Sequence, residues 1–153
     1  MQVSIVQYPG SHHLEATVHA YSQILGAQGG EIQCRVVLDN EESIGTPDLL
    51  VLPGGSSYAD YLRPGAIAKI SRINGAIRRF AQDGGAILGI GNGFQVLIEM
   101  GLLPGALLIN RTTKFVGGKV AVRIESKKTP FTRASTKRIL KLPIGCYYGC
   151  YYA

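Results

Sequence analysis

The chain has 153 residues, of which 46% are hydrophobic and 17% charged, as in an ordinary globular domain. The opening MQVSIVQYPG lacks a basic segment followed by a long apolar run, and no apolar stretch approaches the roughly 18 residues that a membrane helix needs. Three cysteines without a repeated metal-ligand spacing argue against a disulfide framework and a zinc site. We therefore expect one cytoplasmic domain over residues 1–153, without a metal, another cofactor or a membrane partner.

The net charge of +6 is unevenly distributed along the chain. Residues 111–141 contain ten Lys and Arg and the single acid Glu125, so this segment carries +9 and the remainder carries −3. A basic block is typical of surfaces that bind nucleic acid or an acidic partner. In KVAVRIE and KRILKL, however, the charges alternate with apolar residues, which favours the solvated face of a half-exposed sheet. Nucleic acid is therefore not expected as a partner.

Apolar runs and helical patterns alternate along the first hundred residues. VSIVQY is a β-rich run that ends at Pro9, and apolar side chains recur at helical spacing in LEATVHAYSQILG. IQCRVVL and DLLVLP are two further apolar runs. PGAIAKISRINGAIRRFAQDGG predicts a helix that begins near Pro64, carries Ile70 and Ile77 on its apolar face, and ends at Gly84. AILGIGNGFQVLIEMG then reads as a strand, a tight glycine turn and an amphipathic helix.

Apolar strands that alternate with helices indicate a parallel sheet covered on both faces. The expected fold class is therefore α/β, with a doubly wound, mostly parallel sheet. In such sheets the functional residues lie in loops that follow the carboxyl ends of the strands. We expect three of these loops, PGSHH, PGGSSYADYLRPG and GIGNGF, to meet at one edge of the sheet.

The turn in AILGIGNGF has the strand, turn and helix of a nucleophile elbow. In such an elbow the helix lowers the pKa of a thiol at the apex, and the next backbone N–H points at the developing oxyanion. The apex here is Gly91, which has no side chain, and the next residue is Asn92. Gly54 and Gly55 would allow a second backbone N–H to approach a ligand. The scaffold for acyl transfer is present without its nucleophile, although the spacing alone is equally compatible with a plain turn.

Two long motifs, LVLPGGSSYADYLRPGAIA and ILGIGNGFQVLIEMGLLPGALL, resemble the class I glutamine amidotransferases. They are similar in particular to the glutaminase subunit of phosphoribosylformylglycinamidine synthase, and YPGS, TKFVGGKVAVRIE, TPFT and LPIG extend the resemblance over nearly the whole chain. The resemblance implies a flavodoxin-like three-layer sandwich, incomplete at its C-terminal end. It also implies glutamine as the family substrate and a large synthetase subunit, which receives the ammonia, as the partner.

The resemblance implies a role for each residue around the turn. The family hydrolyses glutamine with a Cys–His–Glu triad, and its nucleophilic cysteine falls on Gly91. The oxyanion donors fall on Gly55 and Asn92, while Gly54, Gly55 and Gln95 would lie beside the glutamine pocket. The family's His and Glu belong to a His-Pro-Glu motif that the 153 residues do not contain. We therefore expect the chain to be a catalytically inactive member.

Other positions depart from the family pattern. Pro64 stands where the family commonly has a cysteine, and Cys146, Tyr147 and Tyr148 replace a His-Gly-Glu-Gly motif. The adjacent pair His12 and His13 could act as a base or bind a metal, but adjacent histidines in a polar loop are usually solvated. Cys34, within an apolar run, is interpreted as a small core residue. The tail YYGCYYA fits either a contact surface or an uncovered sheet edge.

Three hypotheses of function follow from these observations. The first is a degenerate amidotransferase domain of purine biosynthesis that does not turn over glutamine. The second is a docking or regulatory subunit that keeps the surface for the synthetase or a vestigial glutamine pocket. The third is a basic interaction module that acts through residues 111–141, whose binding to phosphates would weaken as salt rises.

Overall fold

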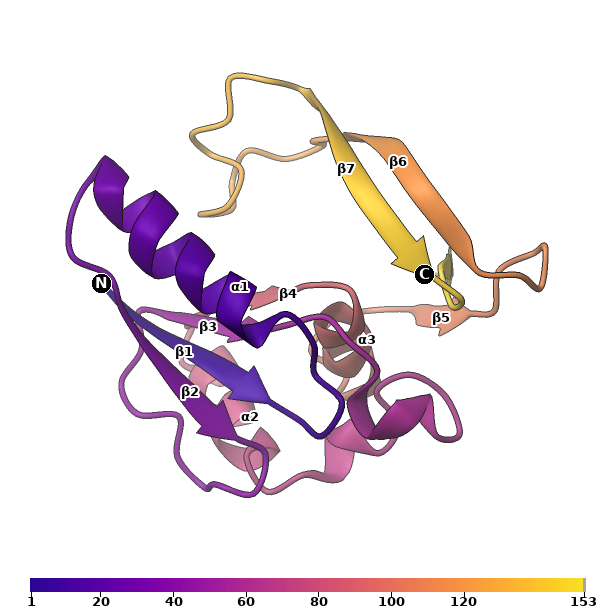
Figure 1. Cartoon of the computed structure of the whole chain (residues 1–153), viewed down its shortest axis with the longest axis horizontal. Helices are drawn as coiled ribbons and strands as arrows, with labels where there is room; N and C mark the ends of the chain where they lie inside the picture. The colour runs from indigo at the N-terminus through magenta and orange to yellow at the C-terminus, as the bar shows by residue number, and fades with distance from the viewer. Residues whose placement is uncertain (153) are drawn as a thin grey trace. The chain divides into compact units, whose positions relative to one another are not determined.

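Four parallel strands form the main sheet of the protein (Figure 1). The structure is a computed structural model that describes residues 1–152, except the side chains of Leu25 and Gln28. Strands β1 (Gln2–Gln7), β2 (Gln33–Leu38), β3 (Leu49–Leu52) and β4 (Ala86–Gly89) pair in the order β2-β1-β3-β4. The central strand β3 has the sequence LLVL and is buried at every position, as a continuous apolar run predicts for a strand covered on both faces.

Helices cover both faces of this sheet (Figure 1). On one face α1 (Leu14–His19) continues as a π-helical turn, Ala20–Leu25, and a 3-10 turn, Gly26–Gln28. On the other face lie α2 (Asn74–Gln82) and α3 (Asn92–Glu99). Successive strand residues point to opposite faces, so two apolar clusters form. The first cluster contains Val3, Ile5, Leu49, Val51 and Tyr21, and the second contains Val6, Leu50, Leu52, Ile77 and Val96. The predicted doubly wound α/β fold is confirmed.

The helix predicted from Pro64 begins ten residues later, at Asn74. A 3-10 turn over Ala68–Ile70 comes first, and Ser71 then adopts an extended backbone with ψ of 151°. The buried Asn74 amide holds this break, because its Nδ2 donates to the Ala68 carbonyl at 2.5 Å and its Oδ1 accepts from the Tyr8 hydroxyl at 2.8 Å. The prediction of one continuous helix was therefore wrong, and Ile70, expected on its apolar face, is 75% exposed.

Residues 107–151 form a second compact unit. Strands β6 (Val116–Arg123) and β7 (Ile139–Cys146) pair antiparallel over eight residues each, from Val116 opposite Cys146 to Arg123 opposite Ile139. At the boundary of this unit, β5 (Ala106–Leu108) pairs with β8 (Cys150–Tyr152). The expectation of one domain over residues 1–153 stays a prediction.

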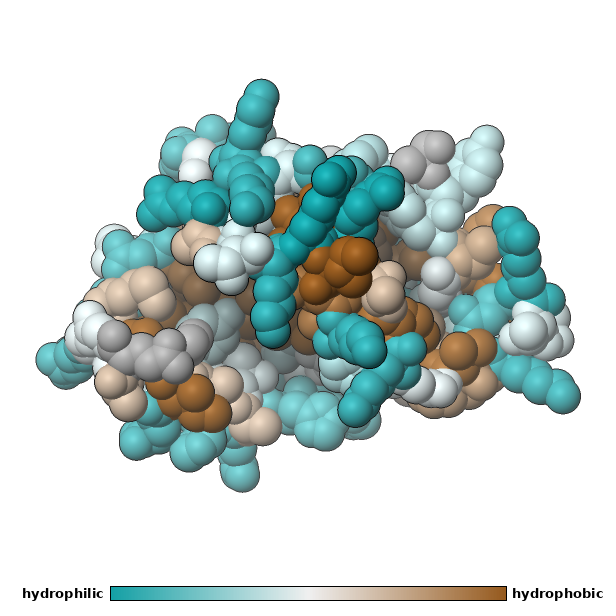
Figure 2. Space-filling model, turned by 90° about the horizontal axis from the view of Figure 1, so that it is seen from above, coloured by the Kyte–Doolittle hydropathy of each residue, from teal (hydrophilic) through white to brown (hydrophobic). Residues whose placement is uncertain are grey.

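Apolar side chains reach the surface at several places. Among them are Leu62, Ile70, Phe115 and Tyr152, each between 66% and 75% exposed. On the face drawn in Figure 2, hydrophobic residues lie among hydrophilic ones. Within residues 1–152, no helix combines the length and the apolarity that crossing a bilayer requires.

Candidate functional site

Three loops meet at the carboxyl edge of the sheet, as the sequence predicts. Ser11, after β1, forms an isolated antiparallel bridge with Gly55, after β3. The His12 N–H donates to the Gly54 carbonyl at 2.8 Å, and the Ser56 N–H donates to the Gly10 carbonyl at 2.9 Å. A Cβ on Gly91 would lie 3.8 Å from the Gly54 Cα, so the turn after β4 reaches the same place.

Gly91 forms a sharp turn between β4 and α3. Its backbone angles are φ 53° and ψ −110°, a combination that residues with a side chain rarely adopt. The residue is exposed, and the nearest atom that an added Cβ would meet is the Gly54 Cα. A small side chain would therefore find room at this apex, at the cost of backbone strain. The geometry is that of a strand–turn–helix junction that presents its apex to solvent.

Gly93 fixes the approach of α3 to the sheet. Its N–H donates to the carbonyls of Pro53 and Ile90, both at 3.0 Å. A Cβ on Gly93 would overlap the backbone carbonyl of Leu52, so no other residue fits without a shift of the helix. The sequence interpretation did not assign a role to Gly93, although the second glycine of GNG was the available signal.

Asn92 ties the start of α3 to the loop after β3. Its buried side chain accepts from the Ser57 N–H at 3.1 Å through Oδ1, and its Nδ2 donates to Asp60 and Gln95, both at 3.1 Å. Among the hydrogen bonds of residues 1–152, none uses the backbone N–H of Asn92 or of Gly55 as a donor. Neither N–H group therefore has an acceptor among the described residues.

Asp60 and Ser57 are site residues that the sequence interpretation missed. Burial raises the pKa of the Asp60 carboxyl, and hydrogen bonds from Ser56 and Asn92 offset part of that effect. The Ser57 side chain is 2% exposed, and its hydroxyl has no hydrogen-bond partner among the described residues. The only sequence signal was an acid in the long loop PGGSSYADYLRPG, whose path could not be derived from its composition.

Gln95, the histidine pair and Cys34 are the remaining residues that the sequence singled out. The half-buried Gln95 accepts the Asn92 amide and donates its backbone N–H to the Gly91 carbonyl at 3.3 Å. His12 and His13 are exposed, in agreement with a solvated pair, and their rings meet edge to face with centroids 6.2 Å apart. Cys34 is partly buried against the α1-facing cluster, as expected for a small core residue.

The loop after β3 contains a left-handed run. Tyr58, Ala59 and Asp60 have φ values of 53°, 55° and 53°. The left-handed region costs a residue with a Cβ roughly 1–2 kcal/mol. The Tyr58 hydroxyl, which donates to Asp39 and lies 3.1 Å from the Ser71 hydroxyl, holds the run against the body of the domain.

Ala59→Gly is therefore expected to stabilise the protein. Glycine relieves about 1–2 kcal/mol of strain and costs roughly 0.4–1 kcal/mol in unfolded-state entropy, so the net gain is up to about 1.5 kcal/mol. The free energy of unfolding in urea measures the change. Ala16→Gly, on the exposed side of α1, is the matched control and should lose about 1 kcal/mol. A loss of equal size at Ala59 would contradict the left-handed assignment.

Glu99 anchors α3 to the segment that follows this loop. Its carboxylate accepts two hydrogen bonds from Arg63, at 2.6 and 2.8 Å, and one from Lys69 at 3.2 Å. The hydrogen bonds from Arg63 are the main cause that lowers the pKa of Glu99, and Lys69 acts in the same direction against burial. A bidentate arginine pair of this kind is stronger than an ordinary surface ion pair.

The pKa of Glu99 is lower in the folded state than in the unfolded chain, where it is about 4.3. The ionised carboxylate therefore contributes fully to the free energy of unfolding above about pH 4.3, and this contribution is lost as the pH falls through the folded-state pKa. We expect Glu99→Gln to lose about 1 kcal/mol of unfolding free energy at pH 7, a figure reduced for the partial exposure of Arg63. The difference from the parent should shrink below about pH 4. Urea unfolding at several pH values measures it, and a pH-independent difference would contradict the charge-based explanation.

Comparisons with known proteins agree with this geometry. Residues 1–150 match the family of the CobB/CobQ-like glutamine amidotransferase domain. The chain is 41% identical over 150 residues to the phosphoribosylformylglycinamidine synthase subunit PurQ of Salinibacter ruber, covering 97% of this chain and 62% of the relative. It is 44% identical to the subunit of the same name from Rubrobacter xylanophilus, covering 100% of this chain and 67% of the relative.

A solved structure shows the same fold. A chain in the structure of PurLQS from Thermotoga maritima superimposes with a TM-score of 0.88 at 39% identity, covering 99% of this chain and 68% of that one. The predicted class I glutamine amidotransferase-like fold is therefore confirmed. The chain spans roughly two-thirds of the length of these relatives.

Proposed function

The chain belongs to the CobB/CobQ-like glutamine amidotransferase family, and from that membership we propose a degenerate glutaminase-type subunit of phosphoribosylformylglycinamidine synthase. The relatives named PurQ, which match nearly all of this chain, support the assignment to purine biosynthesis. In this proposal the chain binds glutamine and docks on a large synthetase subunit, but does not hydrolyse the amide.

Gly91 is the observation that carries this proposal. In a cysteine amidotransferase the thiolate attacks the amide carbon and a C–S bond forms, while the C–N bond breaks and the nitrogen takes a proton from the catalytic histidine to leave as ammonia. Gly91 lies at the exposed apex of the turn and offers no atom that could form this bond. The backbone N–H groups of Gly55 and Asn92 have no acceptor among the described residues, which supports a proposed role as donors to a carbonyl oxygen. This combination supports recognition of glutamine without turnover.

Ammonia release from glutamine tests the catalytic half of the proposal. We expect none from the chain, alone or with a large formylglycinamidine synthetase subunit. Gly91→Cys alone should also fail, because the 153 residues do not contain the His-Pro-Glu motif that supplies the family's His and Glu. Turnover by either protein would contradict the proposed inactivity.

Calorimetric titration of the chain into the large subunit, with and without glutamine, tests the docking half. A saturable, stoichiometric heat is expected, because 41–44% identity to PurQ subunits extends over nearly the whole chain. No heat from a sample shown to be folded would contradict a docking role.

A further inference from the structure

The β6–β7 ribbon has two chemically different faces. In an antiparallel pair, residues directly opposite each other project to the same side. Lys119 opposes Pro143, Lys141 opposes Ala121, and Arg123 opposes Ile139, so all three cations share one side. The other side carries the apolar residues Val120, Val122, Leu140, Leu142 and Ile144.

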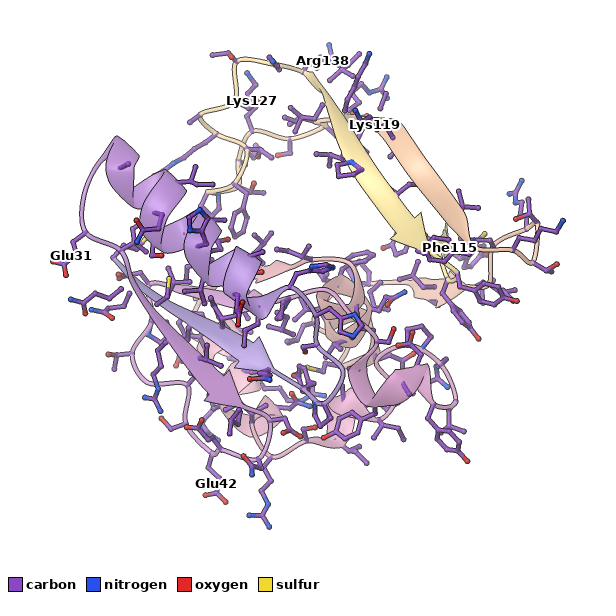
Figure 3. All side chains as sticks on the ribbon, in the orientation of Figure 1. Glu31, Glu42, Phe115, Lys119, Lys127 and Arg138 are labelled. Atoms are coloured by element: carbon purple, nitrogen blue, oxygen red, sulfur yellow. The ribbon has the colours of Figure 1, made fainter. Side chains whose placement is uncertain are left out.

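Phe115 lies on the same side as the three cations. A Cβ on Gly117 would meet the Phe115 ring at 3.5 Å, and a Cβ on Gly145 would meet it at 3.3 Å, so the ring lies over both bare backbone positions. The residue is nevertheless 66% exposed. Figure 3 shows Phe115 near one end of the ribbon, Lys119 along β6, and Lys127 and Arg138 near the opposite end. We call Phe115, Lys119, Arg123 and Lys141 the cation–ring face.

The charges of this face are mostly uncompensated. All three cations are exposed, and among the described residues neither Lys119 nor Lys141 belongs to an ion pair. Arg123 contacts Glu125, at 2.5 Å, and Glu125 is the only acid between residues 107 and 151. Lys119 and Arg123 are four residues apart on β6, and Lys141 on β7 lies opposite the residue midway between them. Measured along the ribbon axis, successive cations are therefore about 6.6 Å apart. The face therefore presents an open row of positive charge that ends at an aromatic ring.

We propose that the cation–ring face binds single-stranded nucleic acid, with phosphates along the row of cations and a base stacked on Phe115. An extended strand offers regularly spaced negative charges and flat bases, which are what cationic grooves with exposed aromatic rings recognise. Lysine is depleted at the cores of protein–protein interfaces, so two of the three cations fit phosphates better than a protein surface. Charged and apolar residues alternate in both strands, and this alternation, which indicated a solvated face in the sequence, leaves the row of cations accessible. The proposal is independent of the amidotransferase assignment.

Fluorescence anisotropy with a labelled 15-residue oligothymidylate tests this proposal on the full chain. We expect saturable binding. The logarithm of the association constant should fall linearly with the logarithm of the salt concentration, with a slope of about −2, because each of three phosphate contacts contributes roughly −0.7. Lys119→Glu with Lys141→Glu should weaken binding at least tenfold and bring the slope to about −0.7. Phe115→Leu should weaken binding about fivefold or more with an unchanged slope, because it removes stacking and no charge.

The matched control is Arg72→Glu with Arg79→Glu, which makes the same charge change on exposed positions at α2 and just before it. Circular dichroism and thermal melting establish that each variant is folded. Equal losses in the two double variants would overturn the proposal in favour of a net-charge effect. Absence of binding would also overturn it. Tighter binding of poly-L-glutamate than of the oligonucleotide, without an effect of Phe115→Leu, would assign the face to an acidic protein instead.

Discussion

Gly93→Ala is expected to destabilise the protein by on the order of 3 kcal/mol or more. The added methyl group would overlap the backbone carbonyl of Leu52, and neither group is at the end of a flexible side chain. The start of α3 would have to move away from β3, which breaks the hydrogen bond from the Gly93 N–H to the Pro53 carbonyl. The measurement is the free energy of unfolding in urea.

Gly91→Ala is the control for this prediction, because it makes the same change two residues earlier. Its added Cβ would meet nothing closer than 3.8 Å, so only the positive φ is unfavourable. A cost of about 1–3 kcal/mol is expected, smaller than that of Gly93→Ala. If Gly93→Ala were the better tolerated of the two, the close approach of α3 to the end of β3 would be wrong.

Asn110→Ala is expected to destabilise the unit formed by residues 107–151 by about 2–4 kcal/mol. The Asn110 side chain is 8% exposed and donates to the carbonyls of Lys114 and Cys146, both at 2.9 Å. It also accepts the Gly149 N–H at 2.9 Å. Alanine would leave three backbone groups without these partners, and the two-stranded ribbon has little core of its own to offset the loss.

Amide hydrogen exchange of β6 and β7 measures this effect without contributions from the parallel sheet. Protection should fall throughout both strands in Asn110→Ala and stay within about 0.5 kcal/mol of the parent in Thr112→Ala, an exposed change two residues away. Unchanged protection in Asn110→Ala would show that the ribbon does not depend on this side chain.

The parallel sheet and the meeting of the three loops could be predicted because their signals are local. LLVL in β3 is apolar without interruption, and such runs specify buried central strands. The turn at Gly91 could also be predicted from a local pattern, because a short apolar strand, a glycine turn and an amphipathic helix are adjacent in the sequence. Parallel strands then bring their carboxyl ends to one edge, which the bridge between Ser11 and Gly55 confirms.

Features that depend on contacts between distant residues could not be predicted. The start of α2 depends on a buried amide, Asn74, whose partner Tyr8 is 66 residues away. The position of Asp60 depends on a left-handed backbone at Ala59, a residue that usually avoids that region. The cation–ring face follows from the register of β6 against β7, and a shift of one residue would reverse the faces of one strand.

The central proposal is that Gly91 stands at the family's nucleophile position, and its most direct test is covalent labelling of Gly91→Cys. A chloroketone analogue of glutamine is the probe, and mass spectrometry locates the thioether that forms when a thiolate displaces chloride. We expect labelling at position 91 that excess glutamine prevents, above the background at the three native cysteines of the parent chain. Position 91 is exposed at the N-terminus of α3, which lowers a thiol's pKa. Labelling of residue 91 that glutamine does not affect, or none in a folded variant, would contradict the claim.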